Sequence, residues 1–259
     1  MSFLYTDRIR KEFGGVIAVS DVDFNVEKNT ITGLIGPNGA GKTTLFNLIT
    51  GLENADEGFV FFKGKDITNL KAYQITRLGI SRTFQNLRLF KEMTVIENLM
   101  VGRHFKSSCQ FSKNRFLNSF LCLFNIDREE KDIYESSMKW LSFFGLENYK
   151  HELPKNMPYG KQKLVEIARA LCAEPEILFL DEPAAGLNPT ETMELLAIIK
   201  KIKELGITIV LIEHDMKFVM NLCEKIFVLN YGRLIASGTP EEIQNNPLVI
   251  EAYLGKENE

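Results

Sequence analysis

The spacing of hydrophobic residues changes along the chain and divides it into three stretches. In the first 30 residues apolar and polar positions alternate, for example at Val22 and Phe24, and this alternation predicts strands. Residues 31–36 predict a buried strand that runs into a glycine-rich loop, 42–51 a helix, and 59–67 a further pair of strands. The opening third therefore predicts a buried strand and a helix accompanied by an antiparallel flap.

The middle stretch, residues 87–168, has helical periodicity instead. Apolar residues recur at spacings of three and four within 94–104 and 129–145. Residues 105–125 lie between these segments, are rich in Phe, Ser and Lys, and predict a surface excursion of the helical lobe. In the last stretch, strand-like and helix-like segments alternate at 177–181, 190–204, 208–214, 215–223 and 225–230. This alternation predicts a mostly parallel sheet with helices on both faces, so one α/β core is interrupted by a helical insert.

The loop after the first buried strand carries a phosphate-binding motif. It fits the pattern G-x-x-x-x-G-K-[ST] between a strand and a helix, which is the setting that the motif requires. Glycines let successive backbone N–H groups face one anion, and the start of the helix adds the positive end of its dipole. Lys42 is expected to reach the β- and γ-phosphates of a nucleotide, Thr43 to ligate Mg²⁺ and Thr44 to donate to the α-phosphate. The candidate ATP-binding residues of this loop are Gly36, Pro37, Asn38, Gly39, Ala40, Gly41, Lys42, Thr43 and Thr44.

A pair of carboxylates follows a second buried strand. The apolar run 177–180 ends at Asp181 and Glu182, and strand ends of this kind are where ligands bind in open α/β sheets. Asp181 is placed to hold Mg²⁺, directly or through water, and Glu182 to polarise the water that attacks the γ-phosphate. Acidic pairs at strand ends are often only solvated turn residues, but the phosphate loop and the apolar strand favour the catalytic interpretation here.

Composition and charge exclude several other classes of protein. The net charge is −3, so no basic field predicts binding to nucleic acid. The longest apolar run, 116–126, is about half the length that spans a bilayer, and the charged residues at the start of the chain do not fit a signal peptide. We therefore expect a soluble protein whose membrane role depends on a partner. The four cysteines lack metal or redox spacing and are expected to be reduced, buried thiols: Cys109, Cys122, Cys172 and Cys223.

The order of the remaining motifs resembles the ATPases of ABC transporters over nearly the whole chain. Gln85, in RTFQN, resembles the glutamine loop that senses Mg²⁺ and the membrane partner, and 157–171 resembles the signature motif with its helix. Asp181-Glu182-Pro183 matches the second nucleotide motif, and 185–189 matches the dimer-facing loop that follows it. His214 matches the switch histidine that contacts the γ-phosphate.

The resemblance implies an ATPase with ATP and Mg²⁺ as cofactors. Its catalytic residues would be Glu182, His214 and Gln85, and its Mg²⁺ ligands Thr43, Gln85 and Asp181. Phe13, just before a glycine pair, lies where the family stacks an aromatic ring on adenine. The implied fold is a single α/β domain over 1–259: a P-loop NTPase (RecA-like) core with an antiparallel β subdomain and an inserted helical subdomain. The expected boundaries are 1–86 and 169–240 for the core, 87–168 for the helical subdomain and 241–259 for a C-terminal tail.

The signature motif departs from the family pattern. It usually begins Leu-Ser-Gly-Gly-Gln, whereas this chain has Met157 followed by Pro158, Tyr159, Gly160 and Lys161. In the family, this segment of a second ATPase closes the nucleotide site of the first, so these residues are expected to act in trans. The missing serine hydroxyl puts the side-chain contact to the γ-phosphate in question, and backbone N–H groups could carry that contact instead.

Several stretches resemble the importers of branched-chain amino acids more narrowly. They include RTFQNLRLFKEMTVIENLMVG, DEPAAGLNPTE and the ending GTPEEIQNNPLVIEAYLG. This implies a peripheral subunit at the cytoplasmic face of the inner or plasma membrane. Its partners would be integral-membrane permease subunits, a second ATPase of the same or a homologous chain and, indirectly, a solute-binding protein. Residues 87–101, with Leu89, Phe90 and Met93 part-exposed, are the candidates for the permease groove, and the alternative is that these three side chains belong to the core. The alternatives are urea or lipopolysaccharide transport and a soluble ABC ATPase that acts on DNA or ribosomes.

Overall fold

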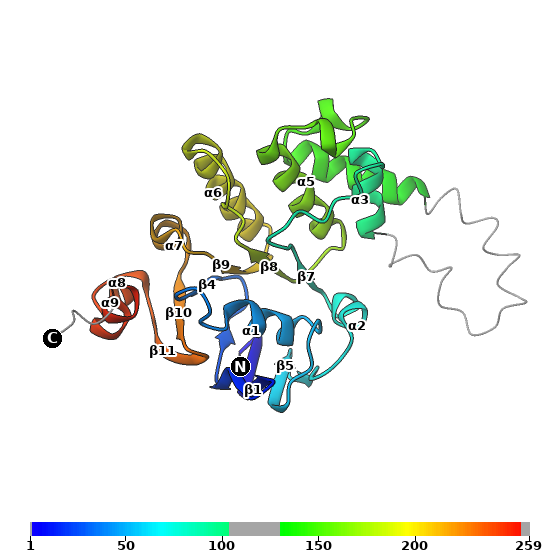
Figure 1. Cartoon of the computed structure of the whole chain (residues 1–259). Coiled ribbons are helices and arrows are strands. Elements are labelled where there is room, and N and C mark those ends of the chain that lie inside the picture. The colour runs from blue at the N-terminus through cyan, green and yellow to red at the C-terminus, as the bar shows by residue number, and fades with distance from the viewer. Residues whose placement is uncertain (1, 104–129, 255–259) are drawn as a thin grey trace, which may run out of the picture. The chain divides into compact units, whose positions relative to one another are not determined.

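The chain folds as two compact units. The computed structural model describes residues 2–103 and 130–254. The first unit combines Met1–Gln85 with Glu176–Glu259, and the second comprises Asn86–Pro175. The order of their elements can be followed along the chain in Figure 1.

An antiparallel sheet in the first unit is built from the start of the chain. It has the order β2-β1-β5-β6, with β3 paired to β1. The strands span Leu4–Phe13 (β1), Val16–Val22 (β2), Asn25–Val26 (β3), Glu57–Phe62 (β5) and Lys65–Asp66 (β6). The predicted pair of strands over 59–67 corresponds to β5 and β6, and Gly64 turns the chain between them with φ at 74°.

A six-stranded sheet forms the centre of the same unit, in the order β11-β10-β4-β9-β8-β7. Its strands are Ile31–Ile35 (β4), Ile80–Arg82 (β7), Ile177–Asp181 (β8), Thr208–Ile212 (β9), Lys225–Asn230 (β10) and Arg233–Gly238 (β11). The neighbours from β10 to β7 run parallel, and β11 pairs antiparallel to β10. All residues of β4, β8 and β9 are buried, as their continuous apolar runs predict for parallel strands covered on both faces.

One hydrophobic core joins the two sheets of the first unit around α1, Lys42–Ile49. The ring of Phe46 in α1 meets that of Phe179 in β8 edge-on, with centroids 4.9 Å apart, and Phe24 reaches Phe227 in β10 at 4.6 Å. The other helices of this unit are Ala72–Arg77 (α2), Pro189–Glu204 (α6), Met216–Leu222 (α7), Pro240–Gln244 (α8) and Pro247–Leu254 (α9).

The second unit is helical among its described residues. It contains α3, Val95–Arg103, a helix over 130–143, and α5, Tyr159–Cys172, with short 3₁₀ turns at Glu147–Tyr149 and Pro154–Asn156. The helical periodicity of 94–104 and 129–145 is therefore confirmed wherever these segments are described. The surface excursion predicted for 105–125 lies outside the described residues.

The described part of the expected tail is largely helical, since α8 and α9 lie within 240–254. The side chain of Thr239 caps α8 by accepting a hydrogen bond from the backbone N–H of Glu242, and the side chain of Glu242 accepts one from the backbone N–H of Thr239. Pro240 is the first helical residue. This capping box is visible in the sequence TPEE and could have predicted the helix. Within the described ranges, every helix is too short or too polar to cross a bilayer.

Candidate nucleotide-binding and hydrolysis site

The phosphate loop leaves β4 and enters α1 through two glycines that no other residue could replace without strain. Gly36 has φ at 149°, and a Cβ there would lie 2.1 Å from the carbonyl oxygen of Leu229. Gly41, the N-cap of α1, has φ at 98°, and a Cβ would lie 2.3 Å from the carbonyl oxygen of Ala18. Since a glycine cap brings no side chain, the first N–H groups of α1 remain available for an anion.

Lys42 turns its ammonium group inward beneath the loop. Its Nζ donates to the carbonyl oxygens of Gly36 and Pro37 at 2.6 and 2.9 Å. The side chain is 8% exposed, and burial lowers the pKa of Lys42, while Glu182 and Asp181 act in the opposite direction. A cation held between the loop and two carboxylates is suited to bind phosphate. Thr43, beside it, is exposed, and Thr44 is half-buried.

Asp181 is held by Arg82, a residue that sequence reasoning missed. Arg82 Nη2 donates to Asp181 Oδ2 at 2.7 Å, and both side chains are almost fully buried. The other end of the guanidinium donates to Asn47 Oδ1 and Thr50 Oγ1 of the α1 region, at 2.7 and 3.1 Å. Arg82 thus joins β7, β8 and the helix of the phosphate loop. The sequence did offer one signal for Arg82: an arginine that lies within a buried strand needs a buried partner for its charge.

Glu182, Gln85 and His214 meet at the carboxyl edge of the parallel sheet. Gln85 Nε2 donates to Glu182 Oε2 at 2.9 Å, and His214 Nδ1 lies 3.9 Å from the same oxygen. Glu182 adopts φ of 47°, a conformation that costs a non-glycine residue roughly 1–2 kcal/mol, directly after β8. The structure therefore brings the three predicted catalytic side chains together around one carboxylate.

Glu213 is another buried acidic residue near the site, and the sequence analysis did not identify it. It is 1% exposed, and its Oε1 accepts from the backbone N–H of Ala184 at 2.7 Å, while Oε2 accepts from that of His214 at 3.2 Å. Burial raises the pKa of Glu213, and these backbone hydrogen bonds oppose part of that rise. Glu213 thereby joins the end of β9 to the loop that follows Glu182.

Two of the residues expected to bind Mg²⁺, Thr43 and Asp181, offer oxygen donors. Thr43 offers a hydroxyl and Asp181 a carboxylate, and Asp181 Oδ2 is the oxygen already bound to Arg82. Among the described residues there is no group of three or more His, Cys, Asp or Glu that could hold a metal. Mg²⁺ is usually bound in proteins by one or two carboxylates together with water and substrate phosphates, and the roles of Thr43 and Asp181 in binding it stay predictions. Gln85, the third expected ligand, is bound to Glu182 here.

Phe13, the residue expected to stack on adenine, ends β1 as a 46% exposed ring. The ammonium of Lys11 lies 5.2 Å from the ring centroid, and Lys11 also binds Asp56 at 2.8 Å. Exposure of an aromatic ring suits stacking on a base, and its role in adenine binding stays a prediction.

The altered signature segment begins a helix of the second unit. Pro158 is the N-cap of α5, and the helix starts at Tyr159, so the N–H groups of Tyr159, Gly160 and Lys161 belong to its first turn. Tyr159 is 43% exposed, whereas Gly160 is buried within the single chain. The first turn therefore presents an exposed aromatic side chain where the family usually has glycine, and Pro158 takes the place of the usual serine.

The predicted permease groove is part-exposed, as expected. Phe90 is 48% exposed, and Leu89 and Met93 are half-buried. The loop is organised by Asn98, which is fully buried, accepts from the N–H of Phe90 at 2.8 Å and donates to its carbonyl oxygen at 3.0 Å. The guanidinium of Arg169 lies 5.7 Å from the Phe90 ring.

Of the four thiols expected to be reduced and buried, two are described and fit that expectation. Cys172 and Cys223 are free and buried, and burial raises the pKa of Cys172 to about 12. Cys109 and Cys122 lie outside the described residues.

A glycine-rich phosphate loop and an acidic pair on one edge of a parallel sheet define an ATP-hydrolysing P-loop protein. The comparisons with known proteins agree with this class. The model of the ABC transporter family matches residues 19–185, and that of the branched-chain amino acid ATP-binding cassette transporters matches 233–259. The chain belongs to the ABC transporter family, and it is an ATPase.

Relatives match this chain over nearly its whole length. The high-affinity branched-chain amino acid transport ATP-binding protein LivG of Escherichia coli is 44% identical over 98% of both chains. The corresponding protein BraF of Pseudomonas aeruginosa is 44% identical over 94% of both. A nucleotide-free ATP-binding cassette from an ABC transporter has a similar structure, with a TM-score of 0.85, 39% identity and coverage of 99% of this chain and 100% of that one.

Proposed function

We propose that this chain is the ATP-hydrolysing subunit of an importer that powers uptake of branched-chain amino acids through separate membrane subunits. The observation that carries the solute class is the match of residues 233–259 to the branched-chain amino acid cassette model. Identity of 44% to relatives with that transport role, over nearly the full chain, supports it.

The site supports in-line attack of water on the γ-phosphate of ATP. The backbone N–H groups of residues 38–44 and the Lys42 ammonium would bind the phosphates, and Thr43 and Asp181 would hold Mg²⁺, which would neutralise charge that develops on the phosphate oxygens. Glu182 would orient the water and accept its proton, with Gln85 and His214 fixing the carboxylate.

Three kinds of partner would complete this function. A second ATPase, identical or homologous, would place the first turn of its own α5 against the nucleotide, so that binding energy closes a dimer and hydrolysis opens it. Permease subunits would bind the part-exposed surface around Leu89, Phe90 and Met93, and a solute-binding protein would act upstream of them. The subunit would then work as a peripheral protein on the cytoplasmic face of the membrane.

Transport in reconstituted vesicles tests the solute class. Permease genes found beside this reading frame would be coexpressed with it, and uptake of labelled leucine, urea and an unrelated sugar would be compared. ATP-dependent leucine uptake that Lys42→Ala abolishes is the expected result. Urea uptake without leucine uptake, or copurification with nucleic acid or ribosomes in place of a membrane protein, would contradict the proposal.

A further inference from the structure

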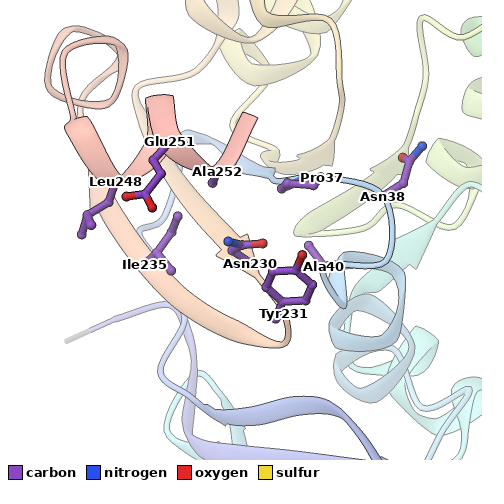
Figure 2. A pocket seen from close by; sticks show the side chains of 9 residues that line it. All are labelled: Pro37, Asn38, Ala40, Asn230, Tyr231, Ile235, Leu248, Glu251 and Ala252. Atoms are coloured by element: carbon purple, nitrogen blue, oxygen red, sulfur yellow. The ribbon is translucent and has the colours of Figure 1, made fainter. Parts of the chain in front are cut away.

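The phosphate loop faces a cavity on one of its sides. This cavity, of about 440 Å³, is lined by residues of the loop, of the β10–β11 turn and of α9, including Pro37, Asn38 and Leu248, as Figure 2 shows. A hollow gives the loop no packing contacts on that side, so its position depends on the elements at its two ends, β4 and α1. Whatever holds α1 against the sheet therefore also places Thr43, which lies in its first turn.

Arg82 ties α1 to the strand that carries the acidic pair. Its Nη1 donates to Oδ1 of Asn47 in α1 at 2.7 Å and to Oγ1 of Thr50, the C-cap of that helix, at 3.1 Å. Its Nη2 donates to Oδ2 of Asp181, at the end of β8, at 2.7 Å. One guanidinium therefore connects the helix that carries Thr43 with the strand that carries Asp181.

The guanidinium of Arg82 has little freedom to change its direction. Its Cζ lies 5.6 Å from the ring centroid of Phe46, on α1, and 5.3 Å from that of Phe84, and only 6% of the side chain is exposed. A planar guanidinium fits such a site better than an ammonium group, because its donors have fixed directions and serve several acceptors at once. A rigid group thus sets the place of the Asp181 carboxylate relative to α1.

We propose that Arg82 is a positioning residue for magnesium: it fixes the Asp181 carboxylate relative to α1, so that Asp181 and Thr43 offer their oxygens to the metal together. This inference rests on the proposed hydrolysis of MgATP and not on the transported solute. Hydroxyl and carboxylate oxygens suit Mg²⁺, and a carboxylate can accept from a guanidinium and bind a metal at once, since Oδ1 takes no part in the Arg82 hydrogen bond. A group that orients a metal ligand contributes about 10- to 100-fold to metal affinity.

Arg82→Lys in the full-length chain tests this role, because lysine keeps the charge and loses the fixed directions of the donors. The Mg²⁺ concentration for half-maximal ATP hydrolysis should rise about 10- to 100-fold. ATP affinity in EDTA should stay within about 2-fold of wild type, since the loop and Lys42 bind the phosphates. Electron paramagnetic resonance of Mn²⁺ with the chain and ADP measures metal binding without hydrolysis and should show the same fold-change. Arg8→Lys, at an exposed position, is the matched control and should change none of these values.

A second variant separates the connection to α1 from the buried ion pair. Asn47→Ala removes one acceptor of Arg82 on α1 and leaves the pair with Asp181 in place. It should weaken metal binding about 2- to 10-fold, the range of one net hydrogen bond, at a Tm close to that of wild type.

Wild-type metal affinity in Arg82→Lys would overturn the proposal. An equal loss of ATP affinity with and without Mg²⁺ would also overturn it, because Arg82 would then serve the fold and not the metal. A wild-type chain that hydrolyses no ATP at any Mg²⁺ concentration would instead contradict the proposed function, and Mn²⁺ binding with ADP would still decide the role of Arg82.

Discussion

The position of Glu182 at the edge of the sheet combines backbone strain with two polar neighbours. Its left-handed φ of 47° sets the direction of the carboxylate, and Gln85 donates to it at 2.9 Å. The presence of glutamate at this position therefore indicates a chemical role, because glycine or asparagine would adopt the same backbone conformation with less strain.

Glu182→Gln tests the catalytic role most directly. Glutamine keeps the size and can still accept from Gln85, but it cannot take a proton from water. We expect ATP affinity near that of wild type, turnover lower by orders of magnitude, and accumulation of an ATP-bound dimer. Steady-state kinetics and size-exclusion chromatography with ATP would measure these effects, and hydrolysis at a near-normal rate would exclude the role.

Arg82 is the residue whose importance is most evident in the structure and least evident in the sequence. It is buried with Asp181 and donates to three acceptors on two elements. Removing one partner of a buried pair leaves the other charge without compensation, so Arg82→Ala should lower the free energy of unfolding by about 3 kcal/mol.

Lys63→Ala provides the comparison for Arg82→Ala. Lys63 pairs with Glu176, but both side chains are more than 40% exposed, so its loss should cost less than about 1 kcal/mol. Urea denaturation of the two variants would give the difference. Equal losses would show that the Arg82 pair contributes no more than a surface contact.

At the scale of elements, Glu213 connects the end of β9 to the loop after β8, and it makes this connection dependent on pH. The pKa of Glu213 is raised by burial above its ordinary value of 4.5, so the folded state binds this proton more tightly than the unfolded chain does. Folding stability contributed by this group therefore falls as pH rises from 4.5 through the raised pKa.

Glu213→Gln removes that titration while keeping an acceptor for the N–H of Ala184. The free energy of unfolding of the variant, relative to wild type, should increase steadily as pH rises from 4.5 toward neutrality. Glu194→Gln, at an exposed position of α6, should show no such slope. Parallel stability curves for Glu213→Gln and wild type would contradict the effect.

The first turn of α5 is the element on which the proposed dimer depends. A side chain at Gly160 would intrude between the backbone N–H groups and a partner's phosphate, and a carboxylate would repel it. We expect Gly160→Asp, in the Glu182→Gln background, to abolish ATP-driven dimerisation while the monomer still binds ATP. Because Gly160 is buried, the Tm of the double variant must be compared with that of Glu182→Gln alone. An ATP-dependent dimer of the double variant would show that the first turn of α5 does not lie at the dimer interface.

Pro158→Ser is the milder companion of Gly160→Asp, since it restores the serine that the family usually has at the N-cap. Serine caps helices well, and backbone groups would carry the phosphate contact in either variant. Turnover should therefore change by less than about tenfold. A larger gain would mean that the hydroxyl, and not the backbone, makes the contact.

For the molecule as a whole, the spacing of motifs predicted site residues that lie close together along the chain, and it missed contacts between residues that are far apart in the sequence. The phosphate loop and the acidic pair are contiguous motifs next to apolar strands, so spacing alone identified them. Arg82 finds its carboxylate 99 residues away, and Glu213 meets Ala184 across 29. No spacing rule relates such positions, because strand order decides which residues meet.

The order of strands in the central sheet has a consequence for how this chain is made. β4 lies between β9 and β10, and its residue Ile31 pairs with Ile209. At ribosomal rates of roughly 5–20 residues per second, the strand waits about 9–36 s for its first neighbour to be synthesised. During that interval a segment that is fully buried in the folded chain has no sheet to enter and is prone to aggregate. A nascent chain of this protein should therefore bind ribosome-associated chaperones until β9 has emerged, and ATP cannot stabilise it earlier, because its phosphate loop has no sheet behind it.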